Sequence, residues 1–169
     1  ASADPSLNPY TFGEWTAPGD EHTPPRFTIF RLTVNNYQYP KIQVDPLSAT
    51  VITKNKRYYE ALSYSDLYNY YRTFWIGRTG QGREAFQART DALKRTLYND
   101  ALIFSGNEEQ GFLVFPTLHD DVSDIRVQIK DIALRFDYAN APIETLDLHF
   151  SFHRDILQGK TPETAQPRN

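Results

Sequence analysis

The chain of 169 residues contains no cysteine and no methionine. The absence of cysteine excludes disulfides, zinc–thiolate centres and thiol nucleophiles. No apolar run approaches the roughly 18 residues that a membrane-spanning helix needs. The net charge of -3 is too small to favour binding of the whole chain to nucleic acid. We therefore expect neither a transmembrane segment nor a nucleic-acid partner.

The chain begins at Ala1 without an initiating methionine. Removal of a signal peptide explains this start, and trimming of a longer chain is the alternative. We expect an exported protein, periplasmic or at the cell surface. Attachment to a lipid through a residue preceding Ala1, as in a lipoprotein, would leave the same sequence.

Composition divides the chain into three parts. Residues 1–25 hold five prolines, four acidic residues and no lysine or arginine, and residues 158–169 are polar. We predict an extended, Pro-rich acidic arm at residues 1–25 and a polar tail at residues 158–169. Residues 26–157 are long enough for one domain with a hydrophobic core.

The last strand has the clearest pattern. Leu146, Leu148, Phe150 and Phe152 alternate strictly with polar residues, which predicts a strand with one buried and one solvent-facing side. In the strand before it, the apolar phase slips by one residue between residues 125–129 and residues 132–136. A β-bulge at Lys130-Asp131 explains that slip. We predict further strands at residues 26–34, 41–44, 49–53, 57–62 and 112–115, with turns at residues 35–36 and 140–142.

Residues 64–75 have a helical pattern, with aromatic and apolar side chains on one face and polar side chains on the other. Ser63 caps this helix, and Asp66 stands at the acidic position of a capping box. A flexible loop is predicted at residues 77–82. A second helix at residues 83–98 is expected to bury Phe86, Thr90, Leu93 and Leu97.

Together these elements predict a mainly β fold, an immunoglobulin-like antiparallel β-sandwich of about seven strands with a two-helix hairpin inserted at residues 63–100. Three segments, residues 30–36, 49–59 and 111–116, resemble the immunoglobulin-like domains of exported bacterial proteins and lipoproteins. The resemblance covers residues 26–155 and implies a family largely without assigned function. That family has no catalytic residues to transfer, and the helical hairpin departs from its compact pattern.

The candidates for metal binding and catalysis are sparse. His119, Asp120, Asp121 and Asp124 supply oxygen and nitrogen ligands on one loop, but they lack a calcium-loop spacing. His149 and His153 lie about 13 Å apart along a strand, too far for one metal. The Gly-rich stretch at residues 77–83 lacks a phosphate-loop motif. We therefore predict no metal site, no cofactor and no catalytic residues.

The aromatic helix and the arm are the predicted contact surfaces. The apolar arc of residues 64–75 spans about 160°, wider than one sheet contact requires, which leaves Tyr64, Tyr68, Tyr71 and Trp75 for a partner. Six basic and two acidic residues lie between residues 72 and 95. Further interface candidates are the arm's anchors and acids, and the arginines of the hairpin loop: Phe12, Trp15, Asp20, Glu21, Arg78 and Arg83.

The sequence therefore predicts a non-catalytic, exported accessory or structural subunit. Its partners would be protein subunits of a larger, membrane-associated complex, with a possible location at the membrane surface. The alternative is a carbohydrate-binding module in which the aromatic hairpin provides a stacking platform. An exposed row of coplanar tyrosine or tryptophan rings would favour that alternative.

Overall fold

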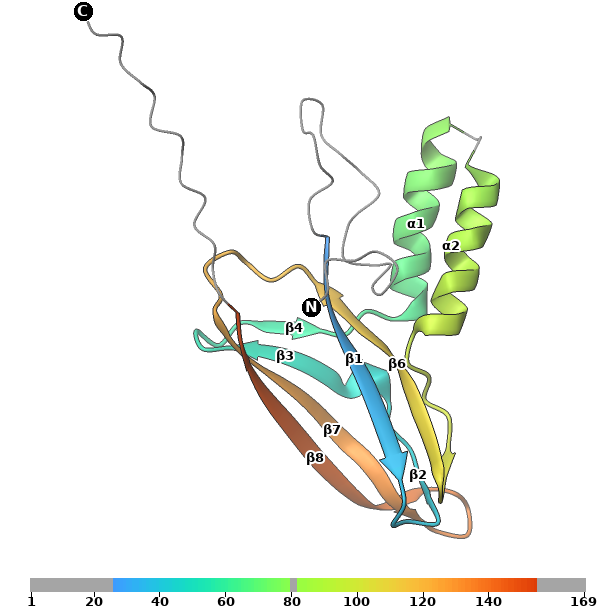
Figure 1. The fold of residues 1–169 in the computed structure, drawn as a ribbon, viewed down its shortest axis with the longest axis vertical. Coiled ribbons are helices and arrows are strands. Elements are labelled where there is room, and N and C mark those ends of the chain that lie inside the picture. Colours follow the sequence, from blue (N-terminus) through green and yellow to red (C-terminus); the bar gives the residue numbers. More distant parts are fainter. Residues whose placement is uncertain (1–25, 80–81, 155–169) are drawn as a thin grey trace, which may run out of the picture.

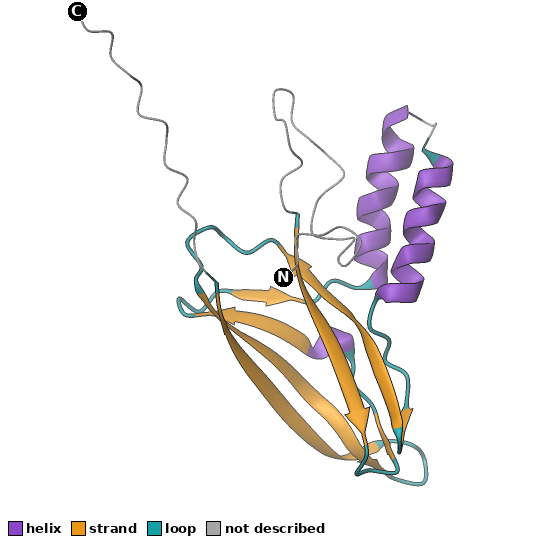
Figure 2. Ribbon diagram, in the orientation of Figure 1, coloured by secondary structure: helices purple, strands orange, loops and turns teal. Residues whose placement is uncertain are grey.

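The computed structural model describes residues 26–79 and 82–154 (Figure 1). The predicted arm at residues 1–25 and the tail at residues 158–169 lie outside the described residues. The described part of the chain is mainly β, and its two α-helices stand at one end of the strands (Figure 2). The elements in chain order are β1 (Phe27–Asn36), β2 (Lys41–Ile42), a short 3-10 turn (Pro46–Ser48), β3 (Ala49–Thr53), β4 (Tyr58–Glu60), α1 (Tyr64–Thr79), α2 (Arg83–Thr96), β5 (Ile103–Phe104), β6 (Asn107–Pro116), β7 (Asp124–Phe136) and β8 (Pro142–His153).

These strands form three antiparallel sheets. The largest has the order β4-β3-β7-β8, while β1 pairs with β6 and β2 pairs with β5. A bridge between Gln43 and Ala133 connects the end of β2 to β7. The prediction of a mainly β fold with antiparallel sheets and a helical insertion is confirmed. The described strands number eight in three sheets, whereas we expected about seven in two.

The main core lies between the four-stranded sheet and the β1–β6 pair. The largest sheet contributes residues of β3 and β7, and the pair contributes Leu113 and Phe115 of β6. Phe30, Leu32 and Val34 of β1 pack against this core without being fully buried. The two sheets therefore share one apolar layer, as the alternating pattern of their strands requires.

The predicted bulge at Lys130-Asp131 is confirmed. Ile129 pairs with Leu148 and Ile132 with Leu146, so two residues of β7 face one residue of β8. Asp131 adopts a positive φ of 53°, and its backbone N–H donates to Asp147 Oδ1 at 3.0 Å. The extra residue keeps both halves of β7 facing the core.

Asn36 ends β1 and organises the segment that follows it. Its side chain is buried, donates to the backbone oxygens of Tyr39 and Ile103, and accepts from the backbone N–H of Tyr39 at 3.0 Å. The sequence predicted a turn at residues 35–36, but both residues belong to the strand and the bend occupies residues 37–40. A buried amide with its donors and acceptor satisfied stabilises this bend.

The helical hairpin begins at the predicted capping box. The Ser63 hydroxyl and backbone N–H both donate to the Asp66 carboxylate, and the Asp66 N–H donates to Ser63 Oγ. Helix α1 continues through Thr79, so the predicted loop start at residues 77–79 is wrong, and Gly77 is tolerated within the helix. The chain leaves α2 at Leu97, which bridges to Phe112 of β6.

A second apolar cluster attaches the hairpin to the sheet. Leu67 and Tyr71 of α1 and Phe86 and Leu93 of α2 are buried against residues of β1 and β6, among them Ile29. Thr90 is buried as predicted, while Leu97 is only partly buried. The aromatic face of α1 is therefore used in part for attachment within the chain.

Leu67→Ala is expected to lower the free energy of unfolding by about 2–5 kcal/mol, because a fully buried leucine leaves a cavity. Tyr64→Ala, on the exposed rim of the same helix, is the matched control and is expected to cost less. Urea denaturation of both variants gives the comparison. Equal losses would show that the whole aromatic face belongs to the core.

Ser63→Ala is expected to destabilise the chain by about 1 kcal/mol at pH 7, the usual cost of losing a helix cap. Hydrogen bonds from the Ser63 hydroxyl and N–H hold the pKa of the Asp66 carboxyl below its ordinary value. A lowered pKa gives stability that is present above about pH 4 and is lost as the pH falls through the folded-state pKa. The difference between wild type and variant in denaturation experiments should therefore shrink below about pH 4. Ser65→Ala is the control, because Ser65 is exposed in the first turn of α1. Its effect on stability should not change with pH in this range.

Candidate protein-interaction surface

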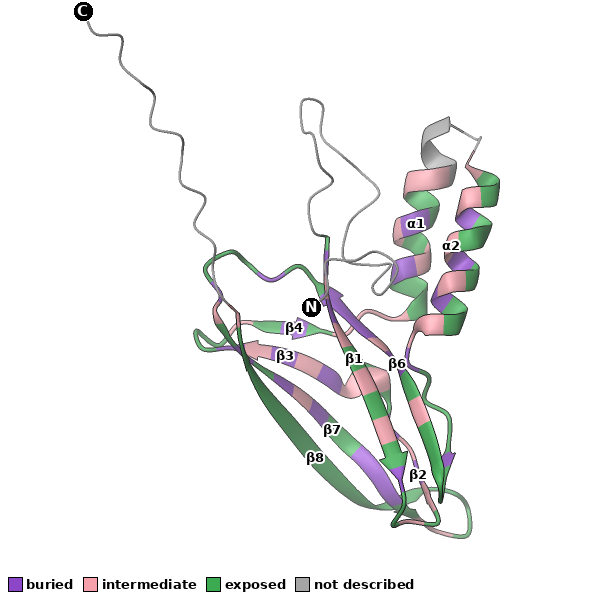
Figure 3. Ribbon diagram, in the orientation of Figure 1, coloured by how far each residue is buried: buried purple, intermediate pink, exposed green. Residues whose placement is uncertain are grey.

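Strand β8 presents the longest row of exposed apolar side chains on any described strand. Register places Leu148 opposite Ile129, Phe150 opposite Val127 and Phe152 opposite Ile125, so these side chains share the face that β7 turns to the core. All of β8 is nevertheless exposed (Figure 3). Leu146, Leu148, Phe150 and Phe152 keep between 38% and 44% of their surface accessible. The sequence predicted a buried face here, and that prediction is wrong.

The exposure follows from the position of β8 in its sheet. It is the last strand in the order β4-β3-β7-β8, and β1 is an end strand of the facing pair. The two end strands approach each other where the rings of Phe30 and Phe152 lie with centroids 5.2 Å apart. Elsewhere the side chains between them line an open groove, which we call the β1–β8 cleft.

The β1–β8 cleft consists of two adjoining hollows of about 500 Å³ and 290 Å³. Leu32, Thr33, Ile129 and Phe150 line both hollows and therefore make them continuous. Among the residues that line the cleft, Arg31 is the one with a formal charge, and its guanidinium donates to Gln110 Oε1. The walls are otherwise apolar or neutral, which suits an apolar occupant.

The helical interface candidates divide between surface and core. Tyr64 is 38% exposed and its ring lies 5.9 Å from that of Tyr68, which in turn meets Phe86 edge-on at 5.1 Å. Tyr71 is fully buried, so it belongs to the hairpin cluster and offers no surface. Trp75 is partly buried, and the plane of its ring is perpendicular to that of the Phe74 ring. These rings do not form the exposed coplanar row that carbohydrate stacking would need.

The remaining predicted interface residues are the arginines of the hairpin loop and four residues of the arm. Arg83 is exposed at the start of α2. The Arg78 side chain lies outside the described residues, as do Phe12, Trp15, Asp20 and Glu21 of the arm. The structure therefore places Tyr64, Tyr68 and Trp75 on one helix.

The acidic loop forms separate ion pairs. Asp121 accepts from Arg57 at 2.8 Å, and Asp124 lies 2.8 Å from His153 Nδ1. Hydrogen bonds from Arg57 and His153 lower the pKa of the Asp121 and Asp124 carboxyls, respectively. The Tyr59 hydroxyl meets His119 Nδ1 at 2.5 Å. Within residues 26–79 and 82–154, His, Asp and Glu side chains are not grouped in threes as metal ligands would be.

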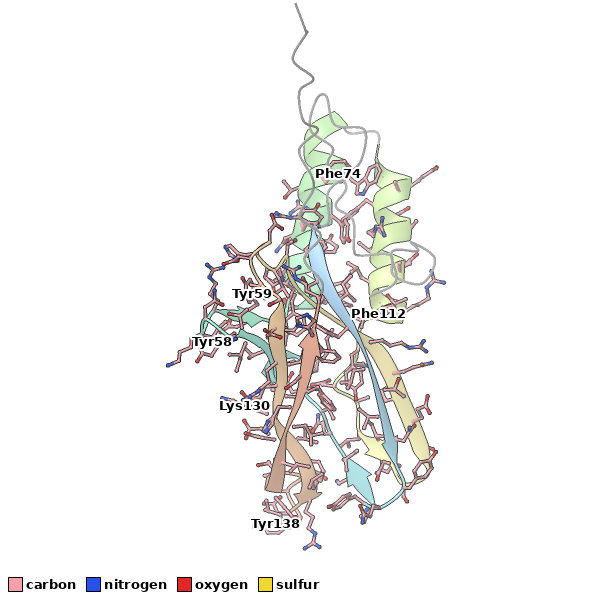
Figure 4. All side chains as sticks on the ribbon, turned by 60° about the vertical axis from the view of Figure 1, so that its left-hand side comes forward. Tyr58, Tyr59, Phe74, Phe112, Lys130 and Tyr138 are labelled. Atoms are coloured by element: carbon pink, nitrogen blue, oxygen red, sulfur yellow. The ribbon has the colours of Figure 1, made fainter. Side chains whose placement is uncertain are left out.

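Sequence reasoning missed a group of exposed apolar side chains on the loops and strands far from the helices. Tyr37 follows β1, Phe104 ends β5, Tyr138 lies in the β7–β8 turn and Ile143 is the second residue of β8; all four are mostly exposed. Figure 4 shows Tyr138 at the end of the molecule opposite Phe74. Single apolar residues in turns and at strand ends give no periodic signal, so their exposure was not predictable from the sequence.

A separate hollow of about 340 Å³ lies at the base of the helical hairpin. Its aromatic lining consists of Tyr64, Tyr98 and Phe112, and burial raises the pKa of Tyr98 well above its ordinary value. The volume is at the lower end for a small-molecule site. Because Tyr98 is almost completely buried, the hollow presents no broad stacking surface.

None of the helices in the described part of the chain is long and apolar enough to cross a membrane.

The cross-strand neighbours Ile129 and Leu148 give a direct test of the uncovered face. Ile129→Ala is expected to cost about 2–5 kcal/mol of unfolding free energy, because Ile129 is buried. Leu148→Ala is expected to cost about 1 kcal/mol, because more than a third of its surface already contacts water. Chemical denaturation measures both. A cost for Leu148→Ala equal to that of Ile129→Ala would mean that β8 is covered in solution.

No family model matches the chain, and no curated protein or solved structure matches it either.

Proposed function

We propose that the chain is a non-catalytic accessory or structural subunit that mediates protein–protein assembly in a larger complex. We further propose an immunoglobulin-like sandwich architecture, with the four-stranded sheet and the β1–β6 pair as its layers and one side left open. Such a fold is a rigid scaffold, and function is added at its edges and loops. An exported, membrane-associated setting is part of the same proposal.

The observation that supports assembly most directly is the uncovered apolar face of β8. Leu146, Leu148, Phe150 and Phe152 stand in line on one side of an end strand, and each remains more than a third exposed. Single exposed apolar residues are common, but a contiguous row is typical of a contact surface. Covering this row would remove apolar surface from water and stabilise a complex.

Two further features support the proposal. The exposed aromatic residues Tyr37 and Tyr138 lie in turns, where tyrosine is a frequent interface residue. On α2 the exposed basic residues Arg83, Lys94 and Arg95 outnumber the exposed acids Glu84 and Asp91. A local excess of one charge steers the docking of a partner more than it strengthens the final contact.

In a native extract, the chain is expected to migrate in an assembly well above its own mass of 19.5 kDa. Blue-native electrophoresis or size-exclusion chromatography of the extract, followed by detection of the chain, gives the measurement. Purified chain alone, run beside it, is the control for self-association. If the chain in the extract migrates as a monomer, the assembly function is wrong.

A further inference from the structure

The two strands that border the β1–β8 cleft both have an unpaired backbone edge. Among the described residues, β1 pairs with β6 alone and β8 pairs with β7 alone. The strands run in opposite directions along the cleft, with Phe30 near Phe152 at one end (Figure 1). An end strand presents unpaired N–H and C=O groups at alternate residues. The cleft therefore combines apolar walls with two rows of main-chain donors and acceptors.

This combination distinguishes between classes of occupant. An acyl chain would cover the apolar walls but would remove the backbone groups of both strands from water without replacing their hydrogen bonds, which is costly. An extended peptide covers the walls with alternate side chains and supplies N–H and C=O groups to both edges. The cleft's chemistry favours the peptide.

We propose that the β1–β8 cleft accepts an extended strand from a partner protein, with apolar side chains at alternate positions turned toward Leu32, Ile129 and Phe150. The proposal rests on the assembly function and names the chemistry of the partner. The row of apolar residues on β8 covers residues 146–152, so the inserted strand should be of similar length.

The partner strand must have both of its edges free. A strand that already belongs to a folded sheet, such as β8 of a second copy, has one edge paired and cannot bond to β1 and β8 together. The occupant is therefore a terminal or loop segment in extended form. Its inward side chains should be uncharged, because Arg31 is the one charged residue of the walls and already donates to Gln110.

The chain's own segments outside the described domain fit this requirement poorly. Residues 1–25 contain five prolines, which lack the N–H that a central strand must donate. Their alternating apolar runs are short, such as Tyr10 and Phe12 or Trp15 and Ala17. Residues 155–169 are mostly polar. Neither of these two segments therefore supplies the inserted strand.

The test uses the full 169-residue chain and a synthetic probe. The probe is a fluorescent peptide of about nine residues in which valine and threonine alternate, flanked by lysines for solubility. Saturable binding should raise its fluorescence anisotropy and slow amide hydrogen exchange in β1 and β8 together. The same peptide with alternate backbone nitrogens methylated keeps its side chains but loses donors, and it should bind at least about tenfold more weakly.

Two variants of adjacent residues locate the site. Leu148→Lys places a charge in the cleft and should weaken peptide binding by about tenfold or more, because that charge would be buried without a partner. His149→Lys adds the same charge on the opposite face of β8 and should change binding by less than about twofold. If Leu148→Lys fails to fold, Leu146→Lys places the charge on the same face of β8 at a more exposed position.

Several results would overturn the proposal. Equal binding of the methylated and unmethylated peptides would show that the backbone edges are not used. Dodecanoate binding without protection of β1 and β8 amides would assign the cleft to an acyl chain. Protection of β8 in the purified chain alone, together with a dimer in sedimentation, would assign it to a second copy.

The strand-accepting cleft and the assembly function can be tested separately. If Leu148→Lys enters the native complex as well as wild type does, the strand-accepting cleft is wrong and the assembly function stands. If wild type itself forms no complex in the extract, the assembly function fails whatever the peptide does.

Discussion

The bulge at Lys130-Asp131 is the local constraint on which the two-layered core depends. Side chains of a strand alternate with a period of two, so a slip of one residue would send half of β7 to the wrong face. The extra residue, with Asp131 at positive φ and its N–H bonded to Asp147, restores the phase. It lets Val127 face the core beside β3, and it lets Leu134 face the same core beyond the point where Gln43 bridges to Ala133.

The helical insertion closes one side of the molecule and thereby makes its two flanks unequal. Both ends of the insertion bond to β6: Leu62 donates to the Val114 carbonyl, and Tyr98 donates to the Phe112 carbonyl. Gly111 permits the close approach, since a Cβ at that position would lie 2.4 Å from the Tyr98 Cα. The edge of β6 that does not pair with β1 is thus covered by residues of the chain itself. The unpaired edges of β1 and β8, on the opposite flank, are bordered by the cleft.

Much of the fold was predictable because local signals agreed with tertiary structure. The bounds of β3, the bulge in β7 and the capping box at Ser63 follow directly from sequence patterns. The two-residue strand β5 and the polar first half of β6 carry no alternation and were missed.

The surface of the molecule was less predictable than its fold. Alternation in β8 identifies a face that is suited to burial, but it cannot say whether the chain supplies a cover. The wide arc on α1 likewise could not show that Tyr71 is buried while Tyr64 remains at the surface.

The pairing of β1 with β6 has a consequence for the order of folding. β1 ends at Asn36, and its partner begins only at Asn107, after both helices. Contacts between such distant segments form late, because the entropy of closing a long loop is lost before those contacts can stabilise the structure. During synthesis Phe27 and Ile29 therefore emerge long before β6 exists to cover them. The hairpin of α1 and α2, held by local contacts, can form in that interval and offer β1 its first apolar surface through Leu67 and Tyr71. The insertion would then serve as an internal template for the first strand while the sheet is still incomplete.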